Sequence, residues 1–278
     1  MIEFKKRENG FEYIEVTNES AQAKIALQGA HIFHFEKDGG KPLLWLSEES
    51  DFVQGKAIRG GIPICWPAFG MDNPDLPQHG FARTSLWEFI QSYESDANTT
   101  NIVFKLGFSA RTLALWDYKF EVTLTITIAE TLTLALKTVN LDEKPFRLTE
   151  AFHTYFSVDS ISTCRIRGLE GKPYLDTLTH EQKRQEGEIY CNSEYDVIFQ
   201  EVDKPIELVT QKRVVKIQNS GSSSVVVWNP WIEKCKKMSA MKDDAYLRFV
   251  CIESANAVDD FRLIQPQKNH TLTTKISF

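Results

Sequence analysis

Two residues that could transfer protons stand in mainly apolar stretches of the sequence. Glu253 follows Leu247–Ile252, where both sets of alternating residues are mainly apolar, as in a central β-strand. A carboxylate at the end of such a strand is expected to be buried, and burial raises its pKa and suits it to proton transfer. His153 lies in the aromatic-rich run Glu150–Phe156, where a lone histidine is more often a satisfied core residue than a catalyst. From the residues alone, Glu253 is the stronger candidate.

A second group of polar residues lies in residues 54–83, an irregular stretch rich in proline and glycine. Arg59 precedes Gly60-Gly61, whose backbone could approach a ligand closely and form an anion-binding concavity. Arg83 ends the motif Gln78-His79-Gly-Phe-Ala-Arg83. Two arginines on one ordered loop could bind a phosphate through charge-assisted, bidentate bonds. The alternative is that each arginine pairs with one of the 38 acidic residues at the surface.

Weaker signals come from Asp196 and from the turn Trp228-Asn-Pro-Trp231. An aspartate before a strand is commonly a turn residue. A tryptophan could stack on the face of a sugar or fill a corner of the core. We expect Trp231 to belong to the core and leave both interpretations open for Trp228.

The elements that must position these residues are predicted to be β-strands. Phe120–Ile128 and Thr131–Lys137 alternate apolar and polar residues, which predicts a hairpin with one buried face. Similar patterns predict strands at Ile102–Phe108, Val225–Trp228, Leu247–Ile252 and Thr271–Phe278, and turns at 38–40, 142–145 and 219–224. No stretch has the period of a long helix. The pattern therefore predicts an all-β, antiparallel sandwich in a single domain spanning residues 1–278.

Apolar residues within 54–83 (Ile58, Ile62, Ile64, Trp66, Phe69 and Phe81) predict that this loop is packed rather than disordered.

Composition narrows the classes of function. The net charge of −6 argues against a general nucleic-acid surface, although local arginines could still bind a small anion. The five cysteines show neither zinc-site spacing nor a disulfide framework. The first residues lack a signal-peptide core and no stretch is long and apolar enough to span a membrane. We expect a cytoplasmic monomer that binds neither nucleic acid nor membrane.

Taken together, the motifs resemble the hexose-6-phosphate mutarotases (glucose-6-phosphate 1-epimerases), a branch of the aldose 1-epimerase superfamily. The resemblance covers roughly residues 25 to 260 and rests on six motifs in family order: Ala57-Ile-Arg-Gly-Gly-Ile-Pro63, Trp66-Pro67 with Phe69-Gly70, Leu76-Pro-Gln-His-Gly-Phe-Ala-Arg83, His153-Thr-Tyr-Phe156, Val227-Trp-Asn-Pro230 and Phe249-Val-Cys-Ile-Glu253. One such motif would be weak evidence, whereas six at sensible spacing are strong.

The resemblance implies a galactose-mutarotase type of β-sandwich without a metal or an organic cofactor. It implies that His153 is the general acid and Glu253 the general base of ring opening. Arg59, Gln78, Arg83 and Asp196 fall on substrate-binding positions, and His79 is a plausible neighbour. The basic stretch Lys234–Lys237 departs from the expected pattern, and it either adjusts substrate choice or is a solvated face.

In this hypothesis Glu253 takes the proton of the anomeric hydroxyl while His153 protonates the ring oxygen, and the two residues exchange roles on reclosure. We expect the carboxylate to favour the imidazolium form of His153. Arg59 and Arg83 would hold the phosphate of the substrate. Three alternatives are a mutarotase for unphosphorylated aldoses, a non-catalytic carbohydrate-binding sandwich and, more weakly, a glycoside hydrolase.

Overall fold

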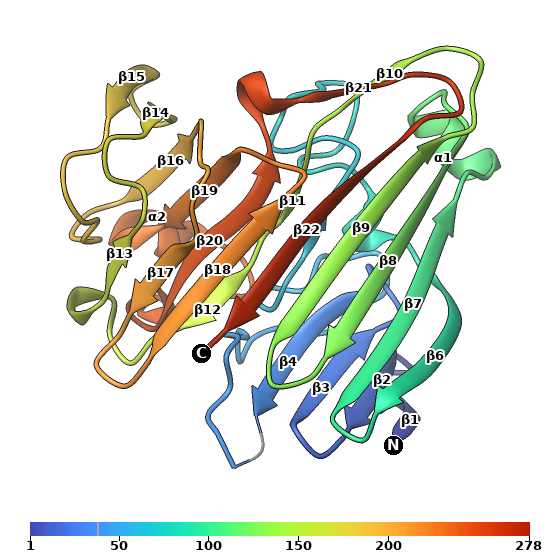
Figure 1. The fold of residues 1–278 in the computed structure, drawn as a ribbon, viewed down its shortest axis with the longest axis horizontal. Coiled ribbons are helices and arrows are strands. Elements are labelled where there is room, and N and C mark those ends of the chain that lie inside the picture. Colours follow the sequence, from blue (N-terminus) through green and yellow to red (C-terminus); the bar gives the residue numbers. More distant parts are fainter. Residues whose placement is uncertain (38) are drawn as a thin grey trace.

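Period-two alternation produces strands whose apolar side chains all enter one interior. The computed structural model describes residues 1–37 and 39–278 (Figure 1). The predicted hairpin is confirmed as β8 (Phe120–Ile128) and β9 (Leu132–Asn140), in which Leu124 faces Leu136. Alternate residues of both strands are buried. Asp38, at the expected turn 38–40, lies outside the described residues.

The hairpin belongs to an antiparallel sheet of eight strands (Figure 1). In spatial order these are β13 (Arg165–Arg167), β17 (Ile206–Val209), β18 (Val214–Ser220), β22 (Asn269–Ser277), β9, β8, β7 (Thr99–Gly107) and β6 (Glu88–Asp96). The strands predicted near 102–108 and 271–278 are therefore confirmed as β7 and β22.

A second antiparallel sheet of eight strands carries most of the candidate site residues. Its order is β15 (Glu181–Arg184), β14 (Pro173–Asp176), β16 (Tyr195–Phe199), β19 (Ser224–Asn229), β20 (Phe249–Asn256), β11 (Glu150–Phe152) and β5 (Ile64–Cys65), with β12 (Tyr155–Ser157) also pairing with β20. One hydrophobic cluster joins the two sheets: it contains Leu124 and Leu136 of the first sheet and Phe152, Val227 and Ile252 of the second. The predicted all-β antiparallel sandwich is confirmed.

Smaller elements complete the fold. A four-stranded sheet is formed by β1 (Ile2–Lys6), β2 (Glu12–Thr17), β3 (Ala21–Ala26) and β4 (His31–Lys37), and a two-stranded sheet by β10 (Phe146–Leu148) and β21 (Arg262–Ile264). The helices are short, namely α1 (Ala110–Leu115), α2 (Trp231–Lys237) and the 3-10 turns at 82–84, 161–163, 245–248 and 258–260. None of the helices in the described part of the chain is long and apolar enough to cross a membrane.

The strand predicted at Leu247–Ile252 begins two residues later. Leu247 and Arg248 end a 3-10 turn, and β20 runs from Phe249 to Asn256. Leu247 N–H donates to Asp244 O (3.1 Å), the backbone bond of this turn, and the exposed Arg248 side chain also pairs with Asp244 (3.0 Å). Glu253 consequently lies within the strand, opposite Val226 of β19, and not at its end.

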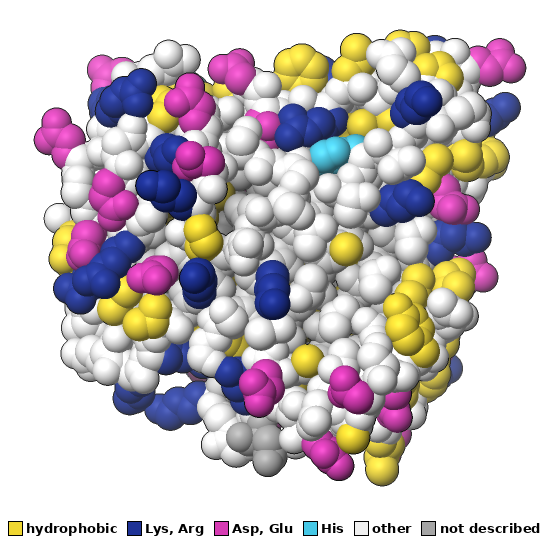
Figure 2. All heavy atoms as spheres, viewed as in Figure 1, with side chains coloured by type: hydrophobic (Ala, Val, Ile, Leu, Met, Phe, Trp, Pro, Cys, Tyr) yellow, Lys and Arg dark blue, Asp and Glu magenta, His cyan; other side chains and the backbone are white. Residues whose placement is uncertain are grey.

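The irregular stretch 54–83 is packed, as predicted. Among its apolar residues, Ile58, Ile62, Ile64, Trp66 and Phe81 are buried, and Phe69 is partly buried. All five cysteines are free and buried. Basic and acidic side chains are interspersed over the face seen in Figure 2, and hydrophobic side chains gather near one margin of it.

One buried carboxyl lies between the two sheets. Glu150 of β11 is fully buried, and neither of its carboxyl oxygens has a hydrogen-bond partner among the described residues. Its nearest titratable neighbour is His270 of β22, whose Nε2 lies 3.6 Å from Glu150 Oε1 and 3.0 Å from Asn256 Oδ1. Burial raises the pKa of Glu150 to about 8 and lowers the pKa of His270 to about 4, so both are uncharged near neutral pH.

The pKa of Glu150 predicts how stability changes with pH. The folded protein keeps this proton up to pH about 8, whereas the unfolded chain loses it near the ordinary value of 4.5. Between these values the folded state binds more protons, so the free energy of unfolding falls by up to about 1.4 kcal/mol per pH unit as the pH rises. Glu150→Gln removes this dependence. We expect the melting temperature of the variant, relative to the wild type, to rise steadily from about pH 5 to about pH 8; parallel curves would contradict the assignment.

Candidate active site

The candidate site residues meet on the outer face of the second sheet. Along β20, Val250 and Ile252 enter the core between the sheets, whereas Cys251, Glu253 and Ala255 point the other way. A cleft of about 1090 Å³ lies over this outer face. It is lined by all seven residues proposed from the sequence: Arg59, Gln78, His79, Arg83, His153, Asp196 and Glu253.

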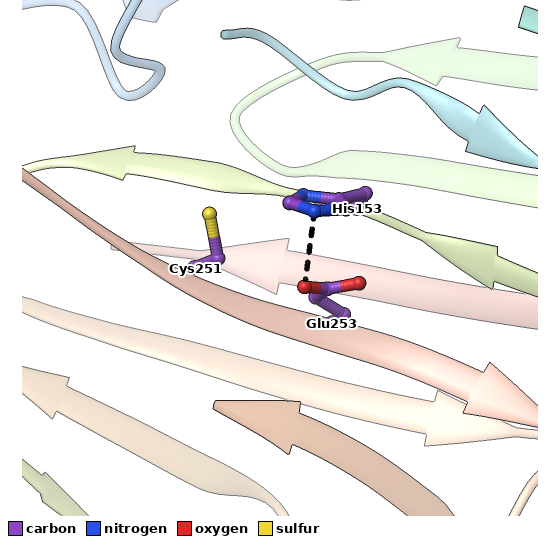
Figure 3. A group of neighbouring side chains, drawn as sticks. All are labelled: His153, Cys251 and Glu253. Carbon is purple, nitrogen blue, oxygen red and sulfur yellow. Dashed lines mark ion pairs between the residues drawn. The ribbon is translucent and has the colours of Figure 1, made fainter. Parts of the chain in front are cut away.

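His153 and Glu253 face each other at the floor of the cleft (Figure 3). His153 Nε2 lies 3.4 Å from Glu253 Oε1, and the two residues are 8% and 1% exposed. The His153 ring stacks on Tyr155, with centroids 4.9 Å apart and an interplanar angle of 16°, and Trp228 meets it edge-on at 5.7 Å. Aromatic packing therefore fixes the imidazole against the carboxyl group. Two atoms of the pair, His153 Nδ1 and Glu253 Oε2, have no hydrogen-bond partner in the described protein.

Burial sets the protonation of this pair. It raises the pKa of Glu253 well above its usual value, with a further increase from Asp196 and an opposing effect of Arg83. It lowers the pKa of His153 well below its usual value, and the neighbouring His79, Arg83 and Arg59 act in the same direction. Burial therefore favours the neutral pair, with a proton on Glu253, over the imidazolium–carboxylate pair expected from the sequence, because desolvation disfavours both charges.

Cys251 lies beside the pair, where its thiol could serve as a third metal ligand (Figure 3). Its thiol and the nearest ligand atoms of His153 and Glu253 all lie within 4.8 Å of one another, a spacing that could hold a metal ion. Burial and Glu253 raise the pKa of the Cys251 thiol well above its usual value, which disfavours the thiolate that a metal would require. The arrangement suits proton transfer between His153 and Glu253 better than metal binding.

The glycines after Arg59 serve the packing of the loop and not the approach of a ligand. Gly60 and Gly61 have φ of 108° and 67°, and a Cβ on either would lie 2.5 Å or less from a backbone oxygen of a neighbouring segment. Gly61 N–H donates to Trp45 O (2.7 Å), and Gly61 O accepts from Tyr155 N–H (2.9 Å). The predicted anion-binding concavity at these glycines is therefore wrong: close contacts with neighbouring backbone explain both residues.

Both arginines of the loop line the cleft. Arg83 Nη2 donates to Gln78 O (2.9 Å), and the Arg59 backbone is held by Ser50 Oγ (3.1 Å). Within residues 1–37 and 39–278, neither guanidinium forms an ion pair with a carboxylate, so the alternative of simple surface pairing does not describe them. Arg147, a third arginine of the cleft, does pair with Asp72.

His79 is held in one protonation state. It has a positive φ of 65°, and its Nδ1 accepts a hydrogen bond from Gly70 N–H (3.1 Å). Burial, with Arg83 and Arg59 nearby, lowers its pKa to about 3. The neutral ring must then carry its proton on Nε2, which makes it a fixed hydrogen-bond donor. Its ring centroid lies 5.7 Å from that of His153.

The opposite wall of the cleft carries Asp196 and Lys234. Asp196 is the second residue of β16 and not a turn residue, and it pairs in register with Trp228. Lys234 Nζ lies 3.4 Å from Asp196 Oδ2 and 2.9 Å from Glu194 Oε1. Burial raises the pKa of Asp196 while Lys234 opposes that shift.

Sequence reasoning did not distinguish the position of Lys234 from that of the other lysines in the basic stretch. Of the lysines in α2, Lys234 lines the cleft, whereas Lys236 pairs with the exposed Glu233. The sequence left open whether Trp228 fills the core or stacks on a sugar; in the structure Trp228 is buried and also borders the cleft. Trp231 is half-buried and packs against Tyr246, with ring centroids 5.1 Å apart. The contact between Tyr155 and His153 was not predicted, although a spacing of two on an extended segment places both side chains on the same face.

Comparison with known proteins gives one consistent group. The family model "Aldose 1-epimerase" matches residues 12–277. A protein of Cenchrus ciliaris named "Putative glucose-6-phosphate 1-epimerase" is 34% identical over 84% of this chain and 74% of its own length. The crystal structure of a "putative mutarotase (YeaD)" from Salmonella typhimurium superposes with a TM-score of 0.92 at 28% identity, covering 99% of this chain and 92% of that one. A galactose mutarotase-like protein from Clostridium acetobutylicum shares the fold, with a TM-score of 0.78, 16% identity and coverage of 99% and 97%.

Proposed function

The chain belongs to the aldose 1-epimerase family, and we propose that it interconverts the α and β anomers of a hexose 6-phosphate, with glucose 6-phosphate as the first candidate. The observation that carries the proposal is one cleft that holds the buried His153–Glu253 pair together with two arginines that have no carboxylate partner among residues 1–37 and 39–278. The pair supplies acid–base chemistry, and the arginines supply a site for a phosphate dianion. The name of the Cenchrus ciliaris relative supports the same substrate.

Ring opening uses the proton that the neutral pair shares, once it has passed from Glu253 to His153 across their 3.4 Å contact. With that proton on His153 Nε2, Glu253 takes the proton of the anomeric hydroxyl while His153 protonates the ring oxygen. The bond between the anomeric carbon and the ring oxygen breaks, leaving an open-chain aldehyde and a proton now on Glu253. After rotation about C1–C2, the reverse transfers close the ring on the other face. No proton is gained or lost over the cycle.

The remaining cleft residues would orient the sugar. The His79 Nε2 proton can only be donated, so it suits a sugar oxygen that accepts. The Asp196 carboxylate, held by Lys234, suits a sugar hydroxyl that donates. Gln78, on the same loop as His79, offers an amide that can do either. These contacts would place the anomeric centre over the pair and the phosphate toward Arg59 and Arg83.

The proposal is tested by dissolving the pure α-anomer of glucose 6-phosphate and following its relaxation by polarimetry. We expect the rate above the spontaneous one to increase in proportion to the protein concentration. Inorganic phosphate should slow this reaction by competing for the two arginines. Relaxation at the spontaneous rate, with the sugar phosphate nevertheless bound, would instead indicate a non-catalytic binding protein.

Lys234 is expected to influence sugar binding through Asp196. Lys234→Met leaves the partly buried Asp196 without its cation, which favours the protonated carboxyl and weakens its bond to a sugar hydroxyl. We expect KM for glucose 6-phosphate to rise by about 3–10-fold, the equivalent of about 1 kcal/mol. Lys236→Met, in the same helix but facing solvent, is the matched control and should stay within about twofold. Equal effects of the two substitutions would rule out a specific role for Lys234.

A further inference from the structure

We propose that His153, Cys251 and Glu253 also form a binding site for a thiophilic divalent cation, Zn²⁺ or Cd²⁺, and that an ion bound there inhibits the enzyme. The three side chains supply one nitrogen, one sulfur and one carboxylate oxygen, and zinc binds all three kinds of donor. The inhibition rests on the proposed function, because it assumes that His153 and Glu253 transfer the protons. The binding rests on the geometry of the three side chains.

The three donor atoms lie close enough together to share one ion (Figure 3). They are all within 4.8 Å of one another, and His153 Nε2 lies 3.4 Å from Glu253 Oε1. Two ligand atoms at about 2.0–2.1 Å from a tetrahedral zinc are about 3.3 Å apart, so this pair already has the required spacing. His153 and Glu253 line the cleft, from which an ion could enter and where the fourth position would stay open. No other group of three such side chains with this spacing occurs in the described part of the chain.

The sheet positions all three donors before an ion binds. Cys251 and Glu253 are two residues apart on β20, so both side chains point to the outer face of the sheet. The His153 ring is held by stacking on Tyr155, with centroids 4.9 Å apart, and Tyr155 pairs in register with Cys251. Because the donors are already ordered, binding an ion costs little conformational entropy.

The donor atoms are not committed to other partners. The thiols of Cys164 and Cys235 each donate to a backbone carbonyl at 3.3 Å, whereas the Cys251 thiol has no such hydrogen bond within residues 1–37 and 39–278. Glu253 Oε2 is buried and also has no hydrogen-bond partner among the described residues. Buried polar atoms are normally paired, so a bound ion would satisfy groups that the protein by itself leaves unpaired.

Charge balance permits a divalent ion in this buried position. Cys251 and Glu253 are 0% and 1% exposed, and burial raises the pKa of both groups well above the usual values, which favours their neutral forms. A coordinating metal ion displaces the protons of both groups to solvent. One ion of charge +2 replaces two protons, so the net charge of the site does not change. Arg59 and Arg83 of the cleft repel a cation, and its affinity must therefore come from direct bonds to the three donors.

An ion in this position stops the proposed reaction. It occupies the nitrogen of His153 and the carboxylate of Glu253, which exchange protons with the sugar in ring opening. Inhibition should therefore follow the occupancy of the metal site, and a chelator should reverse it.

The binding test titrates the wild-type protein with Cd²⁺ and records the ultraviolet charge-transfer absorption of a cadmium–thiolate bond, a readout that needs no substrate. We expect the absorption to saturate at about one equivalent of Cd²⁺, the stoichiometry of a single site. X-ray absorption spectroscopy of the zinc-loaded protein should show one sulfur at about 2.3 Å and nitrogen or oxygen ligands at about 2.0–2.1 Å. A titration without a thiolate band, or a zinc shell without sulfur, would overturn the inference.

Two cysteine variants test whether Cys251 is the sulfur donor. Cys251→Ala should raise the Kd for Cd²⁺ and the half-inhibitory concentration of Zn²⁺ by more than about 100-fold, because loss of a residue that only supports a ligand already costs about 10–100-fold. Cys235→Ala is the matched control, since the Cys235 thiol is buried and bonded to Lys242 O, and this variant should respond to both ions as the wild type does. Inhibition is compared as the ratio of rates with and without the ion. If Cys251→Ala does not fold, the zinc shell of the wild type decides.

The outcomes distinguish this inference from the proposed function. Turnover of glucose 6-phosphate by a protein that binds no Cd²⁺ through a thiolate would overturn the inference and leave the function intact. Equal responses of Cys251→Ala and Cys235→Ala would do the same. A protein that binds Cd²⁺ through Cys251 but, free of metal, does not accelerate the exchange of anomers would overturn the function and leave the metal site.

Discussion

Glu253→Gln is expected to lower kcat for glucose 6-phosphate by about 10²–10⁴-fold, the usual contribution of one positioned proton transfer. Gln has nearly the shape of the protonated glutamic acid that burial favours here, but it cannot take a proton from the anomeric hydroxyl. KM should change by less than about threefold, since the arginines and the sugar contacts remain. Exchange spectroscopy between the anomeric protons of the two anomers measures the loss directly.

A second buried glutamate provides the matched control for this substitution. Glu150 lies on the neighbouring strand β11, is equally buried and also has a raised pKa, but it faces the interior between the sheets. Glu150→Gln should therefore keep its mutarotase activity. If Glu253→Gln kept the full rate while remaining folded, the assignment of the base would be wrong.

Arg59→Met is expected to raise KM for glucose 6-phosphate by about 10–100-fold, since a charge-assisted bond to a phosphate is worth about 1.5–3 kcal/mol. KM for unphosphorylated glucose should change by less than about threefold, because that sugar makes no such bond. Steady-state kinetics on the two substrates with one protein preparation measures both values.

Arg147→Met is the control for the loss of a cleft arginine as such. Because Arg147 is already paired with Asp72, its removal should leave the preference for the phosphorylated sugar unchanged. Equal increases in KM for both sugars in Arg59→Met would contradict the phosphate site, and Arg59 would then be a structural residue of the loop.

The strands were predictable where one face of the strand is buried and the other is exposed to solvent. In β8 and β9 each apolar residue has a polar neighbour, and alternation reports such burial directly. Around Leu247 and Arg248 the same alternation was misleading, because the backbone there forms a 3-10 turn bonded to Asp244 O. Residues 54–83 have no period at all, so only their apolar content indicated that they were packed. The single-domain organisation and the monomeric state stay predictions.

The seven residues that line the cleft were predictable from their motifs, but their electrostatic environment was not. No local pattern shows that His153 and Glu253, a hundred positions apart, meet at 3.4 Å or that burial disfavours the charged form of both. The glycines after Arg59 were misread because a ligand and a neighbouring strand impose the same need for a small residue. The sequence did not show that Lys234, unlike the neighbouring lysines, lines the cleft, because tertiary contacts decide which face of α2 borders it.

The most direct test of the central claim is the rate of exchange between the α and β anomers, measured by NMR for glucose 6-phosphate and for glucose with the same wild-type protein. We predict accelerated exchange of glucose 6-phosphate, with kcat/KM at least about tenfold higher than for glucose, the equivalent of about 1.4 kcal/mol from the phosphate. Exchange of glucose 6-phosphate at the spontaneous rate, or equal kcat/KM for the two sugars, would contradict a hexose-6-phosphate mutarotase.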